Sequence, residues 1–346
     1  MKHLPACIFL IFTATACNAT IPATLPGTQV EPSATWPRSV STIAPQTPIL
    51  IATPTIELAP ATGISTSIPC DPVENYCIET GHFFLDRPIA SPGTDTIDRG
   101  YPYGSTDGGK REPHHGVEFY NASGTPVLAA ADGLVVSAGE DSQTLIGPWL
   151  NFYGKVIVLE HHFPGVPRPV YTLYGHLSEV EAANGQVVRR GEKIGEAGAS
   201  GEAIGSHLHF EVRVGSNDYD STRNPALWLK PLIEKAPAPN GVIAGRILDA
   251  GGKALQATNI NIQFFTDVTQ TQAAAFQIDT YISGNRAARG DDPWNENFTL
   301  SDIPSGNYRI SLVWGGVLYE RWVVVQPGEL TFVVFQFGNR DRIVHE

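Results

Sequence analysis

Glycine and proline interrupt this sequence at short intervals, and they limit what it can fold into. The 346 residues include 34 glycines and 27 prolines, the two residues that most often break helices and form turns. The apolar segments between these breaks are short, as β-strands are. The sequence therefore predicts an all-β protein in which long helices are scarce.

A first group of strand-like runs lies between residues 78 and 232, in a stretch long enough to bury a core and form a cleft. The runs are broken by glycine, and few stretches nearby have a helical period. They cover residues 126–139, 155–160, 169–177, 186–198 and 207–214. We predict a β domain over residues 78–232, ended by a linker at 233–240 that contains "KAPAPN".

Seven further strand-like runs follow the linker, with turn sequences such as "AGGK" and "IPSGNY" between them. Short strands at regular spacing indicate a β-sandwich, which we place at residues 241–340. The segment "FTLSDIPSGNYRISL" (298–312) resembles carboxypeptidase-regulatory-like and transthyretin-like sandwich domains. The resemblance says little about function, and we interpret the domain as a structural or spacing module, with wall or carbohydrate binding as the alternative.

The N-terminus has the pattern of a targeting segment. Lys2 precedes a short apolar stretch, and an A-x-A cleavage pattern ends at residue 16, so residues 1–16 predict a signal peptide. Cys17 follows directly, which resembles a bacterial lipoprotein signal and implies a lipidated Cys17 that anchors the chain to the membrane. Ordinary secretion with cleavage before Cys17 is the alternative. Both place the protein outside the cytoplasm.

Residues 17–68 are predicted to be a disordered tether. Between 18 and 67 there are ten threonines and eight prolines but only three charged residues, a composition that cannot bury a core. Just beyond it, Cys70 and Cys77 are close enough to pair in an oxidising compartment. That pairing would leave Cys17 as an odd thiol, which lipidation explains.

The charge of the chain excludes one class of partner. The formal net charge is −12, and no long basic run occurs, so we expect no nucleic-acid binding.

Two histidine motifs indicate a metal site. In "HLHFEV" the side chains of His207 and His209 lie on one face of a strand, and Leu208 lies on the other. In "HHGVEF" the spacing of His114 and Glu118 places both on one face of a strand or a helix. Gly116 removes a side chain between them and leaves room for an ion.

Two histidines and a carboxylate with an open fourth position form a catalytic zinc site. A further histidine beside the metal would act as acid or base, and His176, in "YTLYGHL", is the candidate. Each of these histidines also has an ordinary alternative as a partly exposed residue without a role.

The motifs together are similar to those of the lysostaphin-type zinc endopeptidases, which cut peptidoglycan peptides. "HHGVEFYNASGTPVLAAADGLVVSAG", "YTLYGHL", "VVRRGEKIGEAGASG" and "SHLHFEV" follow that pattern in order, over roughly residues 95–215. The resemblance implies a barrel-sandwich fold (duplicated hybrid motif) with one Zn²⁺ in a groove. It implies that His114, Glu118 and His209 are the zinc ligands. It also implies that His176 and His207 position water or stabilise the oxyanion, and that His115 is not a ligand.

One ligand departs from the family pattern, which has aspartate where Glu118 stands. Both carboxylates bind zinc at similar lengths, but glutamate is longer by one methylene, so the metal or the backbone must shift. We predict an active zinc endopeptidase that cuts stem or cross-bridge peptides. The alternatives are a catalytically degenerate wall-binding or regulatory lipoprotein and a zinc peptidase acting on secreted proteins.

Two further features concern the neighbourhood of the site. His161 and His162 end a strand-like run, and we interpret both as structural. The segment Glu140–Gly154 is longer than the usual connection in the family. We expect it to form one wall of the groove, with Trp149 and Phe152 on it, or to pack on the barrel.

Overall fold

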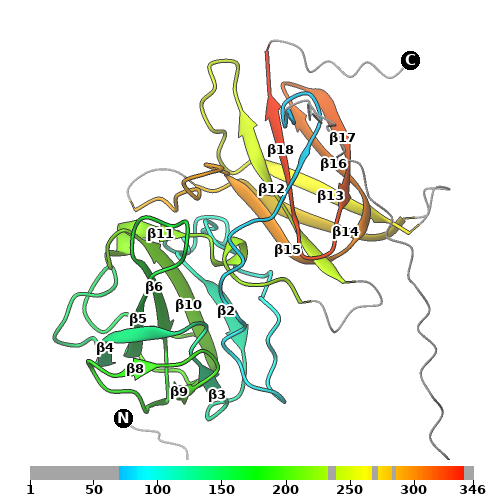
Figure 1. The fold of residues 1–346 in the computed structure, drawn as a ribbon. Coiled ribbons are helices and arrows are strands. Elements are labelled where there is room, and N and C mark those ends of the chain that lie inside the picture. The colour runs from blue at the N-terminus through cyan, green and yellow to red at the C-terminus, as the bar shows by residue number, and fades with distance from the viewer. Residues whose placement is uncertain (1–69, 233–238, 267–271, 283–285, 339–346) are drawn as a thin grey trace, which may run out of the picture. The chain divides into compact units, whose positions relative to one another are not determined.

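The computed structural model describes residues 70–232, 239–266, 272–282 and 286–338 (Figure 1). In these ranges the regular structure is β-strand, apart from two short 3-10 turns, η1 (Tyr219–Ser221) and η2 (Pro225–Leu227). None of the helical segments described is long and apolar enough to cross a membrane. The predicted signal peptide, Cys17 and the tether all lie outside the described residues.

The first domain is organised around one antiparallel sheet. Its strands in spatial order are β11 (Thr222–Arg223), β10 (His207–Val214), β6 (Val170–Gly175), β5 (Lys155–His161), β4 (Gly133–Glu140) and β8 (Val187–Val188). A further strand, β2 (Val117–Tyr120), pairs with β10. A small sheet adds β3 (Pro126–Leu128), β9 (Lys193–Glu196) and β7 (Glu179–Val180).

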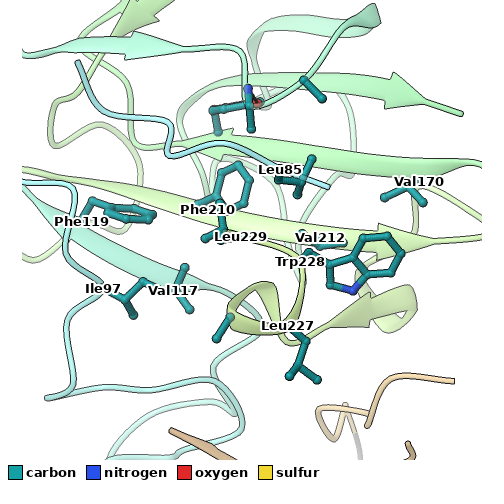
Figure 2. Packing of buried hydrophobic residues seen from close by; sticks show 14 of the residues in the cluster. Leu85, Ile97, Val117, Phe119, Val170, Phe210, Val212, Leu227, Trp228 and Leu229 are labelled. Atoms are coloured by element: carbon teal, nitrogen blue, oxygen red, sulfur yellow. Dashed lines mark hydrogen bonds between the residues drawn. The ribbon is translucent and has the colours of Figure 1, made fainter. Parts of the chain in front are cut away.

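Strand β10 shows how the sequence alternation positions the functional face. All eight of its residues are buried, so both faces of this central strand are covered. Leu208, Phe210 and Val212 belong to the hydrophobic core, where Figure 2 shows Phe210 and Val212 packed with Phe119 and Trp228. The alternate residues are His207, His209, Glu211 and Arg213, which makes the opposite face polar. The predicted alternation is confirmed.

The second part of the chain consists of two four-stranded sheets. One has the order β14 (Gln272–Asp279), β13 (Asn259–Phe265), β16 (Gly306–Trp314) and β17 (Val317–Val325). The other has the order β1 (Cys77–Glu79), β18 (Leu330–Gln336), β12 (Asn240–Leu248) and β15 (Phe298–Pro304). A second apolar cluster contains inward residues of both sheets, among them Ile262, Ile310, Val333 and Phe335. Each of the seven predicted runs overlaps one of the strands β12 to β18.

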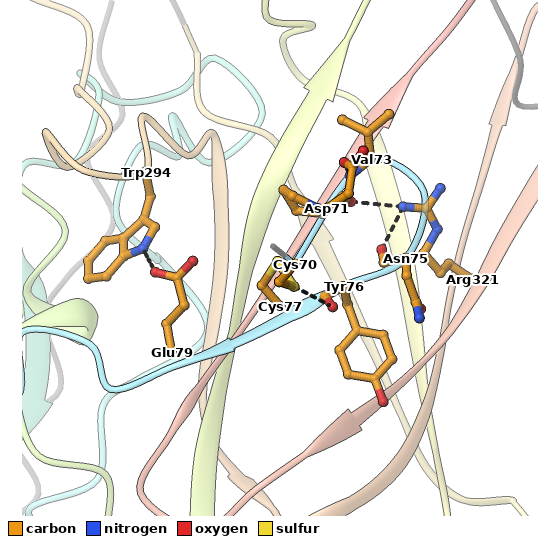
Figure 3. Close-up of a disulfide and its surroundings, with 10 residues drawn as sticks. Cys70, Asp71, Val73, Asn75, Tyr76, Cys77, Glu79, Trp294 and Arg321 are labelled. Carbon is orange, nitrogen blue, oxygen red and sulfur yellow. Dashed lines mark hydrogen bonds between the residues drawn. A yellow bond between two sulfur atoms is a disulfide. The ribbon is translucent and has the colours of Figure 1, made fainter. Parts of the chain in front are cut away.

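Strand β1 is the part of this sheet that the sequence analysis did not predict. Cys77 and Glu79 pair with Phe332 and Leu330 of β18, so a segment that precedes the first domain completes the second. Cys70 and Cys77 form a disulfide in this segment, and Glu79 accepts a hydrogen bond from the indole of Trp294 (Figure 3). The predicted start of the first domain, residue 78, therefore lies inside β1, which belongs to the second part of the chain.

The hydrophobic core of the first domain continues onto the sheet that contains β12. The cluster that contains Leu85 and Trp228 also includes Val242, Ala244 and Phe332. Strand β12 is buried at eight of its nine positions, because side chains cover both of its faces.

Candidate metal centre

The pairing of β2 with β10 brings together the two predicted histidine motifs. Glu118 on β2 is the register partner of His209 on β10. His114 lies in the loop just before β2, where its backbone exchanges hydrogen bonds with Gly104 and Ser105. The side chains of His114, Glu118 and His209 are all buried.

Three side-chain atoms converge at this point. His114 Nε2 lies 2.9 Å from Glu118 Oε1, His209 Nδ1 lies 3.1 Å from the same oxygen, and the two nitrogens are 3.3 Å apart. Ligands bound to zinc at roughly 2.0–2.2 Å in a tetrahedral shell lie about 3.3–3.6 Å from each other. The triangle is therefore close to the size that one zinc ion requires, and glutamate at position 118 reaches both nitrogens.

Hydrogen bonds at the far side of each ring direct the lone pairs toward the triangle. His114 Nδ1 lies 2.6 Å from the carbonyl oxygen of Tyr101, and the two rings stack with centroids 4.2 Å apart. His209 Nε2 lies 3.0 Å from Glu211 Oε1. Because each of these nitrogens must donate its proton, the other nitrogen of each ring is free to act as a metal ligand.

Glu211 is itself held by a buried network. Its carboxylate accepts hydrogen bonds from Arg213 Nε at 2.8 Å and from the hydroxyl of Tyr153, and all three residues are fully buried. Burial alone would raise the pKa of Glu211, but Arg213 and the hydrogen bond with His209 bring it to about 2. Glu211 therefore stays charged and fixes the orientation of the His209 ring.

The buried carboxylate of Glu118 favours a positive charge beside it. Burial would raise the pKa of Glu118, but His209 and the hydrogen bonds of His114 and His207 hold it well below its usual range. Burial would lower the pKa of His209, but Glu118 and Glu211 raise it to about 9. A carboxylate surrounded by imidazoles in this way fits a divalent cation by the chemistry of its donors.

His176 and His207 lie beside the triangle. His207 Nε2 is 2.9 Å from Glu118 Oε2, and the rings of His176 and His207 are 4.9 Å apart. The Nδ1 atoms bond the carbonyl oxygens of Ser200, at 2.9 Å, and Gly205, at 3.1 Å. Burial, with the charges of His209 and His207, lowers the pKa of His176 to about 3, so this imidazole is neutral at pH 7.

The cluster opens into a cavity of about 220 Å³. Aromatic side chains form much of its wall, and Trp149 and Phe152 are among them. The loop that carries both is held by Asp141, whose carboxylate accepts hydrogen bonds from the backbone N–H groups of Tyr153 and Gly154. The segment predicted to form a wall of the groove thus contributes two of its lining residues. The exposed residues Arg111 and Glu202 also line the cavity.

Comparison with known proteins identifies the family of this domain. Residues 112–221 match the model of peptidase family M23. The chain contains an M23 peptidase domain. Peptidoglycan DD-endopeptidase ShyB of Vibrio cholerae is 35% identical over 33% of this chain and 24% of its own length. DD-carboxypeptidase/endopeptidase Mpg of Neisseria meningitidis is 32% identical over 38% of this chain and 26% of its own.

Lysostaphin of Staphylococcus simulans is 33% identical over 38% of this chain and 24% of its own length. The chain thus spans about a quarter of each of these relatives, and in each case the similarity is confined to part of both chains. The M23 match contains all five predicted site residues.

Other histidines of the M23 domain have different surroundings. His115 is buried against Tyr219, and its nitrogens contact the hydroxyl of Thr222 and the carbonyl oxygen of Arg286. His161 bonds Asp132 O and Thr172 Oγ1, whereas His162 is exposed. None of these three belongs to the metal triangle.

Gly116 has another role than the one expected. A Cβ atom at this position would lie 2.6 Å from the carbonyl oxygen of Phe210 and 2.7 Å from His209 Nε2. The missing side chain therefore lets the His209 ring pack against the backbone, where we had expected it to leave room for an ion.

The supporting network of Glu211, Arg213 and Tyr153 was missed by the sequence analysis. Its signal was present, because His207, His209, Glu211 and Arg213 alternate along β10. Continuing the i, i+2 pattern beyond the second histidine would have placed Glu211 on the same face as His209.

Proposed function

We propose that the chain is a zinc-dependent endopeptidase that hydrolyses peptide bonds in peptidoglycan stem or cross-bridge peptides. The observation that carries the proposal is the convergence of His114 Nε2, Glu118 Oε1 and His209 Nδ1 within 2.9–3.3 Å of one another, inside the M23 match. The similar protein ShyB is named a peptidoglycan DD-endopeptidase, which supports the choice of substrate.

His114, Glu118 and His209 would hold the ion and leave one position open to the cavity. A bound zinc ion supplies a Lewis acid for the scissile carbonyl and brings a water molecule to a pKa of about 7. Hydrogen bonds at the far ring nitrogens of His114 and His209 would aim the ligand nitrogens at the ion, which would displace the proton that Glu118 and Glu211 favour on His209.

His176 and His207 supply the proton transfers in this proposal. Their Nδ1 atoms donate to backbone carbonyl oxygens, which leaves each Nε2 with a lone pair or a transferable proton. One of them accepts the proton of the attacking water, and the other stabilises the developing negative oxygen. The chain then needs no serine or cysteine nucleophile.

Glu118 replaces the family aspartate, and its reach supports activity. Its Oε1 atom is within 3.1 Å of both ligand nitrogens, so the longer side chain still places an oxygen at the metal triangle. Glu118→Asp would withdraw the carboxylate by roughly 1 Å, and we expect turnover to fall by up to about a hundredfold. Steady-state kinetics with zinc-loaded protein checks this. A gain of activity would indicate a degenerate site.

We further propose that the protein works outside the cytoplasm, anchored through a lipidated Cys17. The Cys70–Cys77 disulfide supports an oxidising compartment. Mass spectrometry of the mature N-terminus, with the Cys17→Ala variant as control, tests the anchor.

The decisive experiment uses the full chain on purified murein of two cross-link types, one with glycine bridges and one with direct D-amino-acid links. We expect one of them to release soluble muropeptides, chelation to stop the release and added zinc to restore it. A protein that holds little or no zinc and releases no muropeptide from either wall would instead be the catalytically degenerate wall-binding or regulatory protein.

A further inference from the structure

One contact joins the second pair of sheets to the wall of the cavity. Residues 286–297 precede β15 and lie against the first domain. The carbonyl oxygen of Arg286 is 2.8 Å from His115 Nε2, and because a carbonyl only accepts, the imidazole donates. His115 and Tyr219 both line the cavity. The segment that leads into β15 therefore supports a part of the cavity wall.

This segment is fixed to the first domain close to Arg286. The hydroxyl of Tyr103 donates to the carbonyl oxygen of Arg289 at 3.0 Å. The indole of Trp228 donates to the buried carboxylate of Asp291 at 2.5 Å. Because the donors are buried residues of the first domain, the carbonyl oxygen of Arg286 belongs to a segment that is held in place.

Arg286 meets His115 in an unusual backbone conformation. Its φ is 55°, in the left-handed region that residues other than glycine rarely adopt. Such a conformation persists where the surrounding structure holds it, and it often marks a functional position. The guanidinium makes a longer contact, 3.4 Å to the carbonyl oxygen of Pro148. We therefore assign the main role to the backbone carbonyl of Arg286.

His115 in turn holds Tyr219. Their rings stack with centroids 4.0 Å apart and an interplanar angle of 15°. Tyr219 begins η1, a three-residue 3-10 turn, and the hydrogen-bond geometry of such turns is poor. The Tyr219 ring meets Phe152 at 6.3 Å, and Phe152 meets Trp149 at 5.0 Å, both nearly edge-on. These three rings line the cavity, so the position of this aromatic wall depends on His115.

We propose that Arg286 is a positioning residue for substrate binding: through His115, its carbonyl oxygen holds Tyr219 in the aromatic wall of the cavity. The second pair of sheets then contributes to the affinity for substrate. The three wall residues are neither the metal ligands nor the proton-transfer residues of the proposed mechanism, so displacing the wall should weaken substrate binding and leave the chemical step. The inference rests on the proposed function, in which this cavity binds the peptide.

The test compares two substitutions of Arg286 in the full, zinc-loaded chain. Proline fixes φ at about −65° and should move the carbonyl oxygen away from His115, whereas glycine adopts a positive φ readily. We expect Arg286→Pro to raise KM for a soluble cross-linked muropeptide by about tenfold, with kcat within about twofold of the wild type. The amides of residues 216–222 should also exchange hydrogen faster. Arg286→Gly is the matched control, and its KM and its exchange should match the wild type.

His115→Phe tests the same contact without changing Arg286. The ring can still stack on Tyr219 but donates no hydrogen bond to the carbonyl oxygen. KM should therefore rise by roughly 2–10-fold, the usual net contribution of one hydrogen bond, with zinc content unchanged. The proposal is overturned if Arg286→Pro and His115→Phe both keep the wild-type KM. It is also overturned if Arg286→Gly raises KM as much as Arg286→Pro does.

Failure of the proposed function gives a different result. A wild type that releases no muropeptide would refute the proposed peptidoglycan activity, and hydrogen exchange would then decide the positioning role. Faster exchange of residues 216–222 in Arg286→Pro but not in Arg286→Gly would support that role. Equal exchange in the wild type and both variants would overturn it.

Discussion

The buried histidines of the M23 domain form two groups that differ in what their second ring nitrogen contacts. In His114, His176, His207 and His209, one nitrogen bonds a backbone carbonyl or a carboxylate, and the other faces the metal triangle or the cavity. In His115 and His161, protein groups bond both nitrogens. All six are buried, so burial alone does not separate a chemical role from a structural one.

We expect the largest effect from a substitution that removes one ligand of the metal triangle. His209→Ala removes one of three protein ligands, and we expect bound zinc to fall from about one per chain to background. His115→Gln is the control, because His115 is equally buried but both of its nitrogens are engaged elsewhere. Metal analysis of the purified proteins measures both. The comparison fails if His209→Ala keeps its zinc or if His115→Gln loses it.

A smaller effect separates ligands from proton-transfer residues within the first group. His176→Gln leaves the three ligand atoms in place, so zinc content should not change. We expect kcat to fall by roughly 10²–10⁴-fold, the usual contribution of a general acid or base. Steady-state rates on muropeptides at saturating zinc provide the measurement, with His161→Gln as control. Retention of the wild-type kcat by His176→Gln would exclude it from the reaction.

Most of the site could be predicted from the sequence, because the spacing of its residues follows the period of a strand. The i, i+2 spacing of His207 and His209 needs only a strand, and β10 is one. The meeting of Glu118 with His209 depends on the register of β2 against β10. Sequence spacing does not fix that register. The prediction that Glu118 and His209 meet therefore came from the family resemblance.

The parts that were missed depend on contacts between distant segments. Strand β1 has three residues and pairs with β18 at the other end of the chain. So short a strand has no readable period. The carbonyl oxygen of Arg286, which bonds His115 Nε2, likewise comes from a loop whose position no local pattern predicts. The carboxylate of Glu211 is different, since the alternation of β10 indicated it.

The role of Glu211 gives a third and smaller expected effect. Glu211→Gln keeps the shape of the side chain but weakens the charge-assisted bond that orients the His209 ring. We expect zinc affinity to fall by roughly 10–100-fold, as for other residues that hold a metal-bound histidine. Competition with a zinc chelator measures the change. Glu160→Gln is the control, because Glu160 contacts the exposed His162, and unchanged affinity in both variants would refute the positioning role.

The smallest expected effect concerns His161, one of the two histidines with both ring nitrogens bonded by protein groups. It is tested through the pH dependence of stability. Burial lowers the pKa of His161 from 6.5 to about 4. Between these values the unfolded chain binds more protons than the folded one, so this contribution is complete above pH 6.5 and is lost as the pH falls toward 4. Between pH 7 and pH 5.5, His161 should cost the wild type about 1 kcal/mol of unfolding free energy. Urea unfolding at both pH values should show this loss in the wild type but not in His161→Gln. Equal losses in the two proteins would mean that His161 titrates normally and that its burial does not hold it neutral.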